Sequence, residues 1–216
     1  MSATLGILGA GRVGTAVARQ GLRAGYDVAI AASGDPAAIE LIVEVMAPGA
    51  RAVTAAEAAE AGDLVVLSAP LRRYAALDPD MLAGRVVIDA MNYWPETDGH
   101  IAALDEAPSS SQMVADHLPE ARLVKTLNHI GYHELETDHA PAGTSGRRAL
   151  AVAGDDPVAR VTAMGLIEQL GFDAVDAGPL AAGIALEPGS EIFTGRHDRA
   201  ALERLLEHAR AAHAAP

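Results

Sequence analysis

Short runs of Val, Ile and Leu alternate along the chain with longer alanine-rich stretches, and this alternation limits the folds that the chain can adopt. A strand that is buried on both faces of a sheet forms a continuous apolar run, whereas a strand with one wet face alternates apolar and polar residues. Buried strands separated by helical stretches are typical of a parallel sheet covered by helices on both faces. The sequence therefore predicts an α/β fold with a doubly wound, mostly parallel sheet.

The individual elements follow from the apolar runs and from the turn and capping residues that bound them. The predicted strands cover residues 4–8, 27–31, 52–54, 64–68, 86–89, 122–126, 149–153 and 173–176. The predicted helices cover residues 12–24, 36–46, 55–61, 112–117, 157–170 and 201–214, the fourth of them capped from 109–111 and the fifth capped by Asp156. Residues 137–148 are rich in Gly, Pro and Ser and predict a loop. No linker divides the chain, so we expect one domain over residues 1–216 with a small C-terminal extension from about residue 177.

Composition excludes several classes of function. The 216 residues carry 29 acidic and 16 basic side chains, a net charge of −13 that repels a nucleic-acid backbone. The absence of cysteine excludes disulfides, thiolate zinc sites and a cysteine nucleophile. No stretch approaches the roughly 18 apolar residues of a membrane span, and the first residues lack the features of a signal peptide. We therefore expect a cytoplasmic protein whose partners are small-molecule cofactors, not nucleic acid or membrane.

A glycine motif stands directly after the first predicted strand and opens the first predicted helix. It reads Gly9-Ala10-Gly11-Arg12-Val13-Gly14. In such a motif the first glycine permits a tight turn, the second lets the backbone approach a pyrophosphate, and the third allows helix and strand to pack closely. The phosphates then lie at the helix N-terminus. This context predicts a Rossmann-like dinucleotide site; the alternative is a glycine turn with a purely structural role.

The end of the second predicted strand bears on the choice between NAD and NADP. An acidic residue at this place accepts the ribose hydroxyls of NAD and repels the 2′-phosphate of NADP. Here Ala32 occupies that place, and Ser33 follows with a hydroxyl suited to a phosphate. Asp35 either points at the ribose, which favours NAD, or caps the helix that begins at Pro36. We favour the cap and therefore NADP, with NAD as the alternative.

Three later strand ends are expected at the same edge of the sheet, where the ligand crevice of a doubly wound fold lies. Ser68, Ala69 and Pro70 end the fourth strand and are expected to line the nicotinamide half of the cofactor, unless Ala69 and Pro70 only terminate the strand. Met91 and Asn92 follow the fifth strand. Asn128 follows the sixth. A second flat ligand could stack and hydrogen-bond at this edge.

Several other groups have two interpretations. Tyr93 and Trp94 could contact a ligand or fill a hydrophobic loop, and Arg72 and Arg73 could anchor an anion or simply be solvated. The pair formed by His129 and His133 has helical metal-ligand spacing, but a glycine interrupts it and no third ligand follows, so we predict no metal.

The serines at 109–111 precede an Asp-His pair, but no serine of the chain has the strand-elbow-helix context of a hydrolase. The residues supply no obvious catalytic acid, base or nucleophile.

At this point the sequence resembles the family of NADPH-dependent coenzyme F420 reductases, which pass hydride between NADP and the 8-hydroxy-5-deazaflavin F420. The resemblance is carried by the glycine motif, Ser33, Ala58-Ala59-Glu60-Ala61-Gly62-Asp63 leading to Leu67-Ser68-Ala69-Pro70, Asp89-Ala90-Met91-Asn92, Val124-Lys125-Thr126-Leu127-Asn128, Ala177-Gly178-Pro179-Leu180 and Leu186-Glu187-Pro188-Gly189-Ser190. It implies NADP across the glycine loop, the deazaflavin stacked over the nicotinamide, and Ser33 at the 2′-phosphate. The sequence departs from the family after Ser33, where Gly34 replaces an arginine.

The resemblance implies hydride transfer between two redox rings, which requires orientation and exclusion of water more than an acid or base. The phosphate and glutamate tail of F420 would need cations, for which Arg72, Arg73, Arg147 and Arg148 are candidates. Two-domain dehydrogenases add a helical domain after the sheet, and the roughly 40 residues that follow the last predicted strand are too few for one. The alternatives are a reductase of a flavin, ferric complex or small carbonyl or imine compound, and a non-catalytic NADP-binding sensor. A homodimer through the C-terminal segment is plausible.

Overall fold

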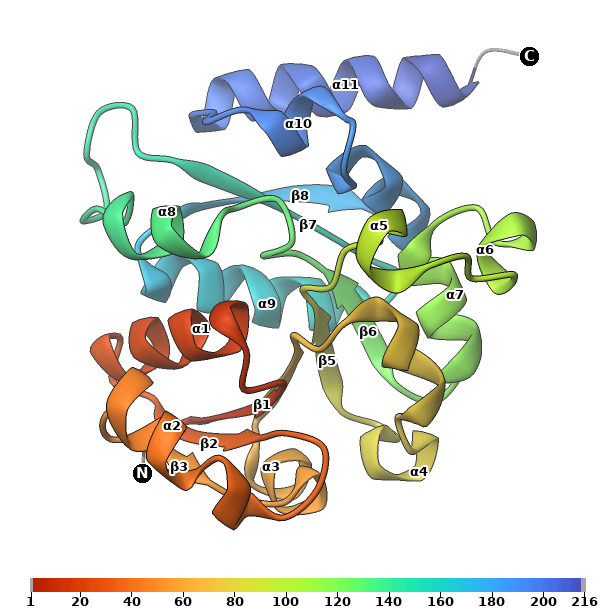
Figure 1. The fold of residues 1–216 in the computed structure, drawn as a ribbon. Coiled ribbons are helices and arrows are strands. Elements are labelled where there is room, and N and C mark those ends of the chain that lie inside the picture. Colours follow the sequence, from red (N-terminus) through yellow and green to blue (C-terminus); the bar gives the residue numbers. More distant parts are fainter. Residues whose placement is uncertain (1, 215–216) are drawn as a thin grey trace.

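One eight-stranded sheet organises the computed structural model, which describes residues 2–214 (Figure 1). Its strands are β1 (Thr4–Leu8), β2 (Asp27–Ala31), β3 (Arg51–Ala52), β4 (Leu64–Leu67), β5 (Val86–Asp89), β6 (Arg122–Lys125), β7 (Ala149–Gly154) and β8 (Asp173–Gly178). They lie in the order β3-β2-β1-β4-β5-β6-β7-β8, and every neighbouring pair is parallel except β6 and β7. The predicted doubly wound, mostly parallel sheet is confirmed.

Helices cover both faces of the sheet. They are α1 (Arg12–Arg23), α2 (Glu40–Met46), α3 (Ala55–Ala61), α4 (Pro79–Leu82), α5 (Pro95–Asp98), α6 (Ala103–Glu106), α7 (Ser110–His117), α8 (Tyr132–Thr137), α9 (Pro157–Leu170), α10 (Glu191–Thr194) and α11 (Arg199–Ala214), with 3-10 turns η1 (Pro36–Ala38), η2 (Leu71–Ala76) and η3 (Leu180–Leu186). Figure 1 shows α1, α8 and α9 on one side of the strands and α4, α6 and α7 on the other. Within residues 2–214, no helix has both the length and the apolarity needed to cross a bilayer.

Two predicted helix starts are confirmed by their caps. The carboxylate of Asp156 accepts hydrogen bonds from the backbone N–H groups of Val158 and Ala159, and Pro157 occupies the first turn of α9. The hydroxyl of Ser109 accepts from the N–H of Gln112 at the start of α7. Each cap satisfies N–H groups that have no partner inside the helix, which fixes where the helix begins.

Several predicted bounds were wrong, including those of the elements expected at residues 52–54, 36–46 and 137–148. The strand expected at 52–54 is β3, Arg51–Ala52, because Thr54 leaves the sheet to form a capping box with Glu57 at the start of α3. The helix expected at 36–46 divides at Ile39 into η1 and α2. The expected loop at 137–148 begins one residue later, because Thr137 ends the unpredicted helix α8.

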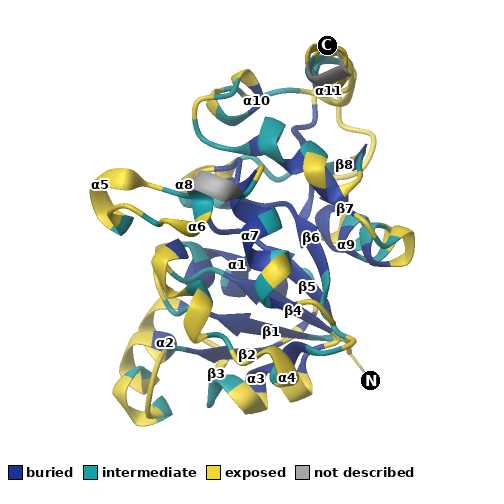
Figure 2. Ribbon diagram, turned by 90° about the vertical axis from the view of Figure 1, so that its right-hand side faces the viewer, coloured by how far each residue is buried: buried dark blue, intermediate teal, exposed yellow. Residues whose placement is uncertain are grey.

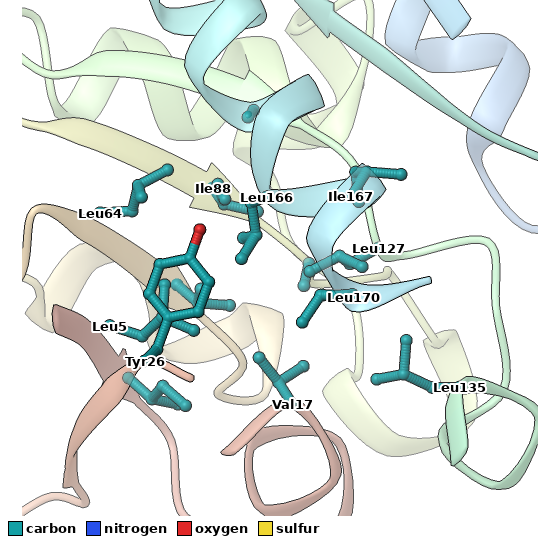
Figure 3. Packing of buried hydrophobic residues seen from close by; sticks show 14 of the residues in the cluster. Leu5, Val17, Tyr26, Leu64, Ile88, Leu127, Leu135, Leu166, Ile167 and Leu170 are labelled. Carbon is teal, nitrogen blue, oxygen red and sulfur yellow. The ribbon is translucent and has the colours of Figure 1, made fainter. Parts of the chain in front are cut away.

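Alternate residues of the central strands pack against opposite helical layers. Leu5 and Ile7 of β1 belong to one buried cluster with Val17 of α1 and Leu166 of α9. Figure 3 shows Leu5, Val17 and Leu166 in this cluster. Leu8 belongs to a second cluster on the face that carries α3 and α7. Figure 2 accordingly shows the central strands buried and the outer surfaces of the helices exposed. Burial of each large apolar side chain contributes about 1.5–3 kcal/mol, so this two-sided core holds the sheet rigid beneath its carboxyl edge.

A third cluster joins the C-terminal segment to the last two strands. Leu186 of η3 and Leu202 and Leu206 of α11 are buried against Ala151 of β7 and Val175 of β8. η3 also packs beside α7 and β6, which brings Leu186 close to the carboxyl end of the central strands. The segment after β8 therefore contributes backbone atoms to the surroundings of the site described next.

Candidate functional site

A cavity of about 450 Å³ opens where the direction of strand winding reverses. β1 and β4 are neighbours in the sheet, and the chain continues from β1 toward one edge and from β4 toward the other. In doubly wound sheets this switch point, at the carboxyl ends of the strands, is where ligands bind. Many of the predicted residues line the cavity: Gly9, Ala10, Gly11, Ser33, Ser68, Ala69, Pro70 and Met91. The topology thus brings together residues from four strand ends.

The three glycines of the motif have three different surroundings. Gly9 adopts φ +133°, and a Cβ there would lie 2.6 Å from the carbonyl carbon of Ser68. A Cβ on Gly14 would lie 1.8 Å from the carbonyl oxygen of Gly9, so only glycine lets the helix approach the loop this closely. A Cβ on Gly11 would meet nothing within 4 Å, because that position faces open space beside the cavity.

The N-terminus of α1 is free to receive an anion. Gly11 is its N-cap, no side chain of the described residues 2–214 caps the helix by a hydrogen bond, and the first turn holds no acidic residue. The N–H groups at the start of a helix carry a partial positive charge and seek acceptors. An open position at Gly11 and unfilled donors behind it fit the pyrophosphate of a dinucleotide.

The loop after β2 forms the far end of the cavity. Ala32 and Ser33 line it, and Ser33 is exposed. Asp35 does not line it; its carboxylate accepts a hydrogen bond of 2.9 Å from the N–H of Ala37 and caps η1. The capping role predicted for Asp35 is therefore confirmed. Among the described residues that line this end, no carboxylate stands directly after β2 to accept ribose hydroxyls.

The four arginines considered as anion anchors separate in the structure. Arg73 lines the cavity. Arg72 does not line the cavity, and its guanidinium donates to the backbone carbonyl of Thr97 in α5. Arg147 and Arg148 are buried in ion pairs: Arg147 pairs with Glu168 and Asp173, and Arg148 pairs with Glu134 and Asp138. The expectation that Arg147 or Arg148 could bind an F420 tail was wrong, because acidic side chains of the protein already hold both guanidinium groups.

Other predicted site residues lie around the cavity without lining it. Arg12 extends over the ring of Tyr132, with its guanidinium carbon 5.8 Å from the ring centroid, and Val13 and Gly14 lie inside the first turns of α1.

Asn92 and Asn128 bond each other: the side-chain amide of Asn128 donates to Oδ1 of Asn92 at 3.1 Å, and the side-chain amide of Asn92 donates to the backbone carbonyl of Asn128 at 2.7 Å. Asn128 is 3% exposed and also donates to the carbonyl of Leu186 at 2.6 Å. The two amides thus brace the strand ends against η3.

A buried ionic network behind the cavity was not predicted. Lys125 is 0% exposed, and its ammonium group donates to Oδ2 of Asp89 at 3.1 Å and to the carbonyl of Met91 at 2.6 Å. Asp89 accepts further bonds from the hydroxyl of Ser111 at 2.7 Å and from the N–H of Met91 at 2.9 Å. The network fixes the backbone of Met91, a cavity residue. Its sequence signal was a lone lysine ending an apolar strand, next to a strand that ends in aspartate.

The remaining polar groups have structural partners. The hydroxyl of Tyr93 donates to the carbonyl of Gly99 at 3.0 Å, and Trp94 is 43% exposed with its ring edge-on to Phe193. The hydroxyl of Ser110 donates to Glu187 at 2.6 Å. Neither aromatic residue lines the cavity. Within the described residues, no group of three His, Cys, Asp or Glu side chains could hold a metal ion.

His129 and His133 lie in contrasting surroundings. His133 is exposed, whereas His129 is buried in the segment after β6, where its Nε2 accepts from the N–H of Ala151 in β7 at 3.0 Å. Burial, together with the positive charges of Arg148 and Lys125, lowers the pKa of His129 to about 3. This imidazole is therefore neutral near neutral pH and accepts through Nε2 while its Nδ1 faces Oδ1 of Asn128.

The depressed pKa of His129 predicts a loss of stability in mild acid. The unfolded chain binds a proton near the usual pKa of about 6.5, whereas the folded chain does not until about 3, so protonation favours unfolding throughout that window. We expect the free energy of unfolding to fall by up to about 1.4 kcal/mol per pH unit through this residue below pH 6. Urea unfolding at pH 7, 6 and 5 measures the slope. His129→Gln should flatten it and His133→Gln should not; equal slopes in the two variants would contradict the assignment.

The part of the chain that lines the cavity matches a known protein family. Residues 4–93 match the model of a family described as NADP oxidoreductase, coenzyme F420-dependent. This confirms the predicted resemblance in the part of the chain that runs from β1 to just beyond β5. No curated protein matches the chain.

Solved structures share the fold over most of the chain. The hypothetical protein SMa0349 from Sinorhizobium meliloti is 27% identical, with a TM-score of 0.73 over 92% of this chain and 96% of that one. A candidate F420-dependent NADP reductase from Arthrobacter sp. FB24 is 24% identical, with a TM-score of 0.70 over 84% and 87%. An imine reductase from Pseudomonas sp. is 16% identical, with a TM-score of 0.60 over 98% of this chain but only 64% of its own length.

Proposed function

We propose that this protein is an oxidoreductase that transfers a hydride between NADP(H) and the deazaflavin coenzyme F420. One observation carries the proposal: every described residue that lines the cavity falls within residues 4–93, the segment that matches the F420-dependent NADP oxidoreductase model. The match and the cavity thus concern the same part of the molecule. An NADP-dependent oxidoreductase is the coarser conclusion, and F420 as the second substrate is the finer proposal.

The residues present fit a dinucleotide in one orientation. The open face at Gly11 and the first turn of α1 would hold the pyrophosphate, and Ser33 would stand near the adenosine ribose. Ser68 and Met91 would then stand at the nicotinamide half. When bound, NADPH supplies the hydride, so the chain itself needs only to orient the two reactants and to exclude water from them.

The cavity has features suited to orienting a bound cofactor and excluding water. The hydroxyl of Ser68 donates to the carbonyl of Gly9 at 3.0 Å, which ties the end of β4 to the glycine loop. The lining of the cavity as a whole includes Met81, Leu77 and Met91, apolar side chains that would keep water from a bound cofactor. The network around Lys125 holds Met91 in place from behind. The proposed roles are therefore orientation and exclusion of water, with no side chain assigned as acid or base.

The test mixes purified protein with F420 and one nucleotide, NADPH in one reaction and NADH in another, and follows the loss of deazaflavin absorbance. We expect turnover with NADPH and much slower turnover with NADH. Absence of turnover with both nucleotides, combined with measurable binding of NADPH, would remove F420 from the proposal. Flavins, ferric complexes and small imines would then be tried as acceptors with the same preparation, and binding without any acceptor would indicate a sensor.

A further inference from the structure

We infer that Arg73, on the turn after β4, supplies the positive charge that selects a dinucleotide carrying a 2′-phosphate. The inference rests on the proposed use of NADP and names the residue that determines it. A 2′-phosphate adds negative charge to the adenosine ribose and needs a charge-assisted donor in an acidic protein. The net charge of −13 increases the need for such a donor, because the electrostatic field of the whole protein repels a negatively charged ligand.

The loop after β2 has no cation to offer. Gly34 follows Ser33 and adopts φ +109°, a conformation that an arginine would enter only with backbone strain. Asp35 comes next, and its carboxylate is engaged at the N–H of Ala37. The loop therefore contributes to the cavity through Ala32 and the hydroxyl of Ser33, neither of which is charged.

Arg73 lies in η2, after β4, and lines the same cavity as Ser33, which follows β2. It is the single Lys or Arg among the described residues that line the cavity, and its side chain is exposed. In the part of the chain that the structure describes, its guanidinium has no hydrogen bond or ion pair, although Arg72 beside it is bonded to Thr97. An arginine with a long stem and free donors can reach a phosphate and bind it through two parallel hydrogen bonds.

Asp78 is the one carboxylate among the described residues that line the cavity, and its position limits its effect. The carboxylate accepts from the N–H of Asp80 at 3.1 Å and caps α4. It is held at the start of that helix, whereas no described group holds the head of Arg73. The lining thus combines one fixed acid with one free arginine, which leaves the arginine available to an incoming anion.

The experiment measures binding and does not depend on the second substrate. NADPH, NADH, 2′,5′-ADP and 5′-AMP are titrated into the native protein, Arg73→Gln and Arg72→Gln by calorimetry and nucleotide fluorescence. We expect Arg73→Gln to weaken NADPH and 2′,5′-ADP by about 10- to 100-fold and NADH and 5′-AMP by less than about 2-fold. Arg72→Gln is the matched control, and it should leave the ratio of NADPH to NADH affinity unchanged. Arg73→Lys should restore part of that ratio.

The other possible outcomes would overturn the inference, each for a different reason. An equal loss for NADPH and NADH would place Arg73 at the pyrophosphate, and no loss for either would remove it from the site. A change of the ratio by Arg72→Gln as large as that by Arg73→Gln would make the effect a general one of surface charge. Failure of the native protein to bind any of the four nucleotides would instead overturn the proposed function itself.

Discussion

Gly11→Val is expected to abolish dinucleotide binding while leaving the protein folded. The position has φ −83° and ψ −167°, an extended conformation that valine adopts without strain, and a Cβ there meets nothing within 4 Å. The added methyl groups would occupy the space through which the backbone approaches the pyrophosphate. We expect affinity for NADPH to fall by at least about 100-fold and the free energy of unfolding to change by less than about 1 kcal/mol.

Gly14→Val is the matched variant, since it places the same side chain three residues later in the same motif. Its Cβ would overlap the carbonyl oxygen of Gly9 at 1.8 Å and the hydroxyl of Ser68 at 2.7 Å. The helix must therefore move away from the loop, and overpacking of this kind costs about 1–3 kcal/mol or more. Urea unfolding and NADPH titration of both variants separate the two effects: Gly11→Val should lose binding alone, and Gly14→Val should lose stability as well.

Two results would contradict this account of the loop. Retained affinity in Gly11→Val would show that the motif is a structural turn and that the cofactor binds elsewhere. Unchanged stability in Gly14→Val would show that the close approach of α1 to Gly9 is not required for folding. Either result would require another explanation for the positions of the glycines in the motif.

The features that could be predicted from the sequence are those that local chemistry determines. The glycine motif requires a strand before it and a helix after it, and Asp35 and Asp156 satisfy N–H groups two or three residues away. Such interactions lie within a few residues and do not depend on the rest of the fold. The continuous apolar runs likewise predict buried strands in a sheet covered on both faces, which the alternating clusters around β1 confirm.

Interactions between residues far apart in the chain could not be predicted in the same way. Arg147 and Arg148 were candidates to bind an F420 tail, yet both are less than 5% exposed, because α8 and α9 supply acidic partners to them. Arg72 and Arg73 are adjacent in sequence, and only the fold decides that one bonds Thr97 while the other faces the cavity. A pattern along one strand identifies which residues are polar, but it does not show which distant group reaches them.

Lys125 and Asp89 form another long-range contact, an ion pair buried on both sides, and Lys125→Met is expected to lower the stability of the protein. Both side chains are 0% exposed, so the variant leaves the Asp89 carboxylate buried, with Ser111 and the N–H of Met91 as its remaining donors among the described residues. Removing one partner of a buried ion pair costs about 3–5 kcal/mol, which for a chain of this size lowers the melting temperature by roughly 10 °C. Differential scanning calorimetry measures the shift.

A double variant separates the ion pair from the simple loss of packing. In Lys125→Met with Asp89→Asn neither charge remains, and the asparagine oxygen can still accept from the N–H of Met91. Because the cost of an unpaired buried charge disappears, the double variant should be more stable than Lys125→Met alone. Arg122→Met, on the same strand, is the external control: its pair with Asp156 is about one-third exposed, so its effect should be much smaller. A double variant no more stable than the single one would show that the lysine acts through packing of its stem, and that Met91 is positioned without the charge.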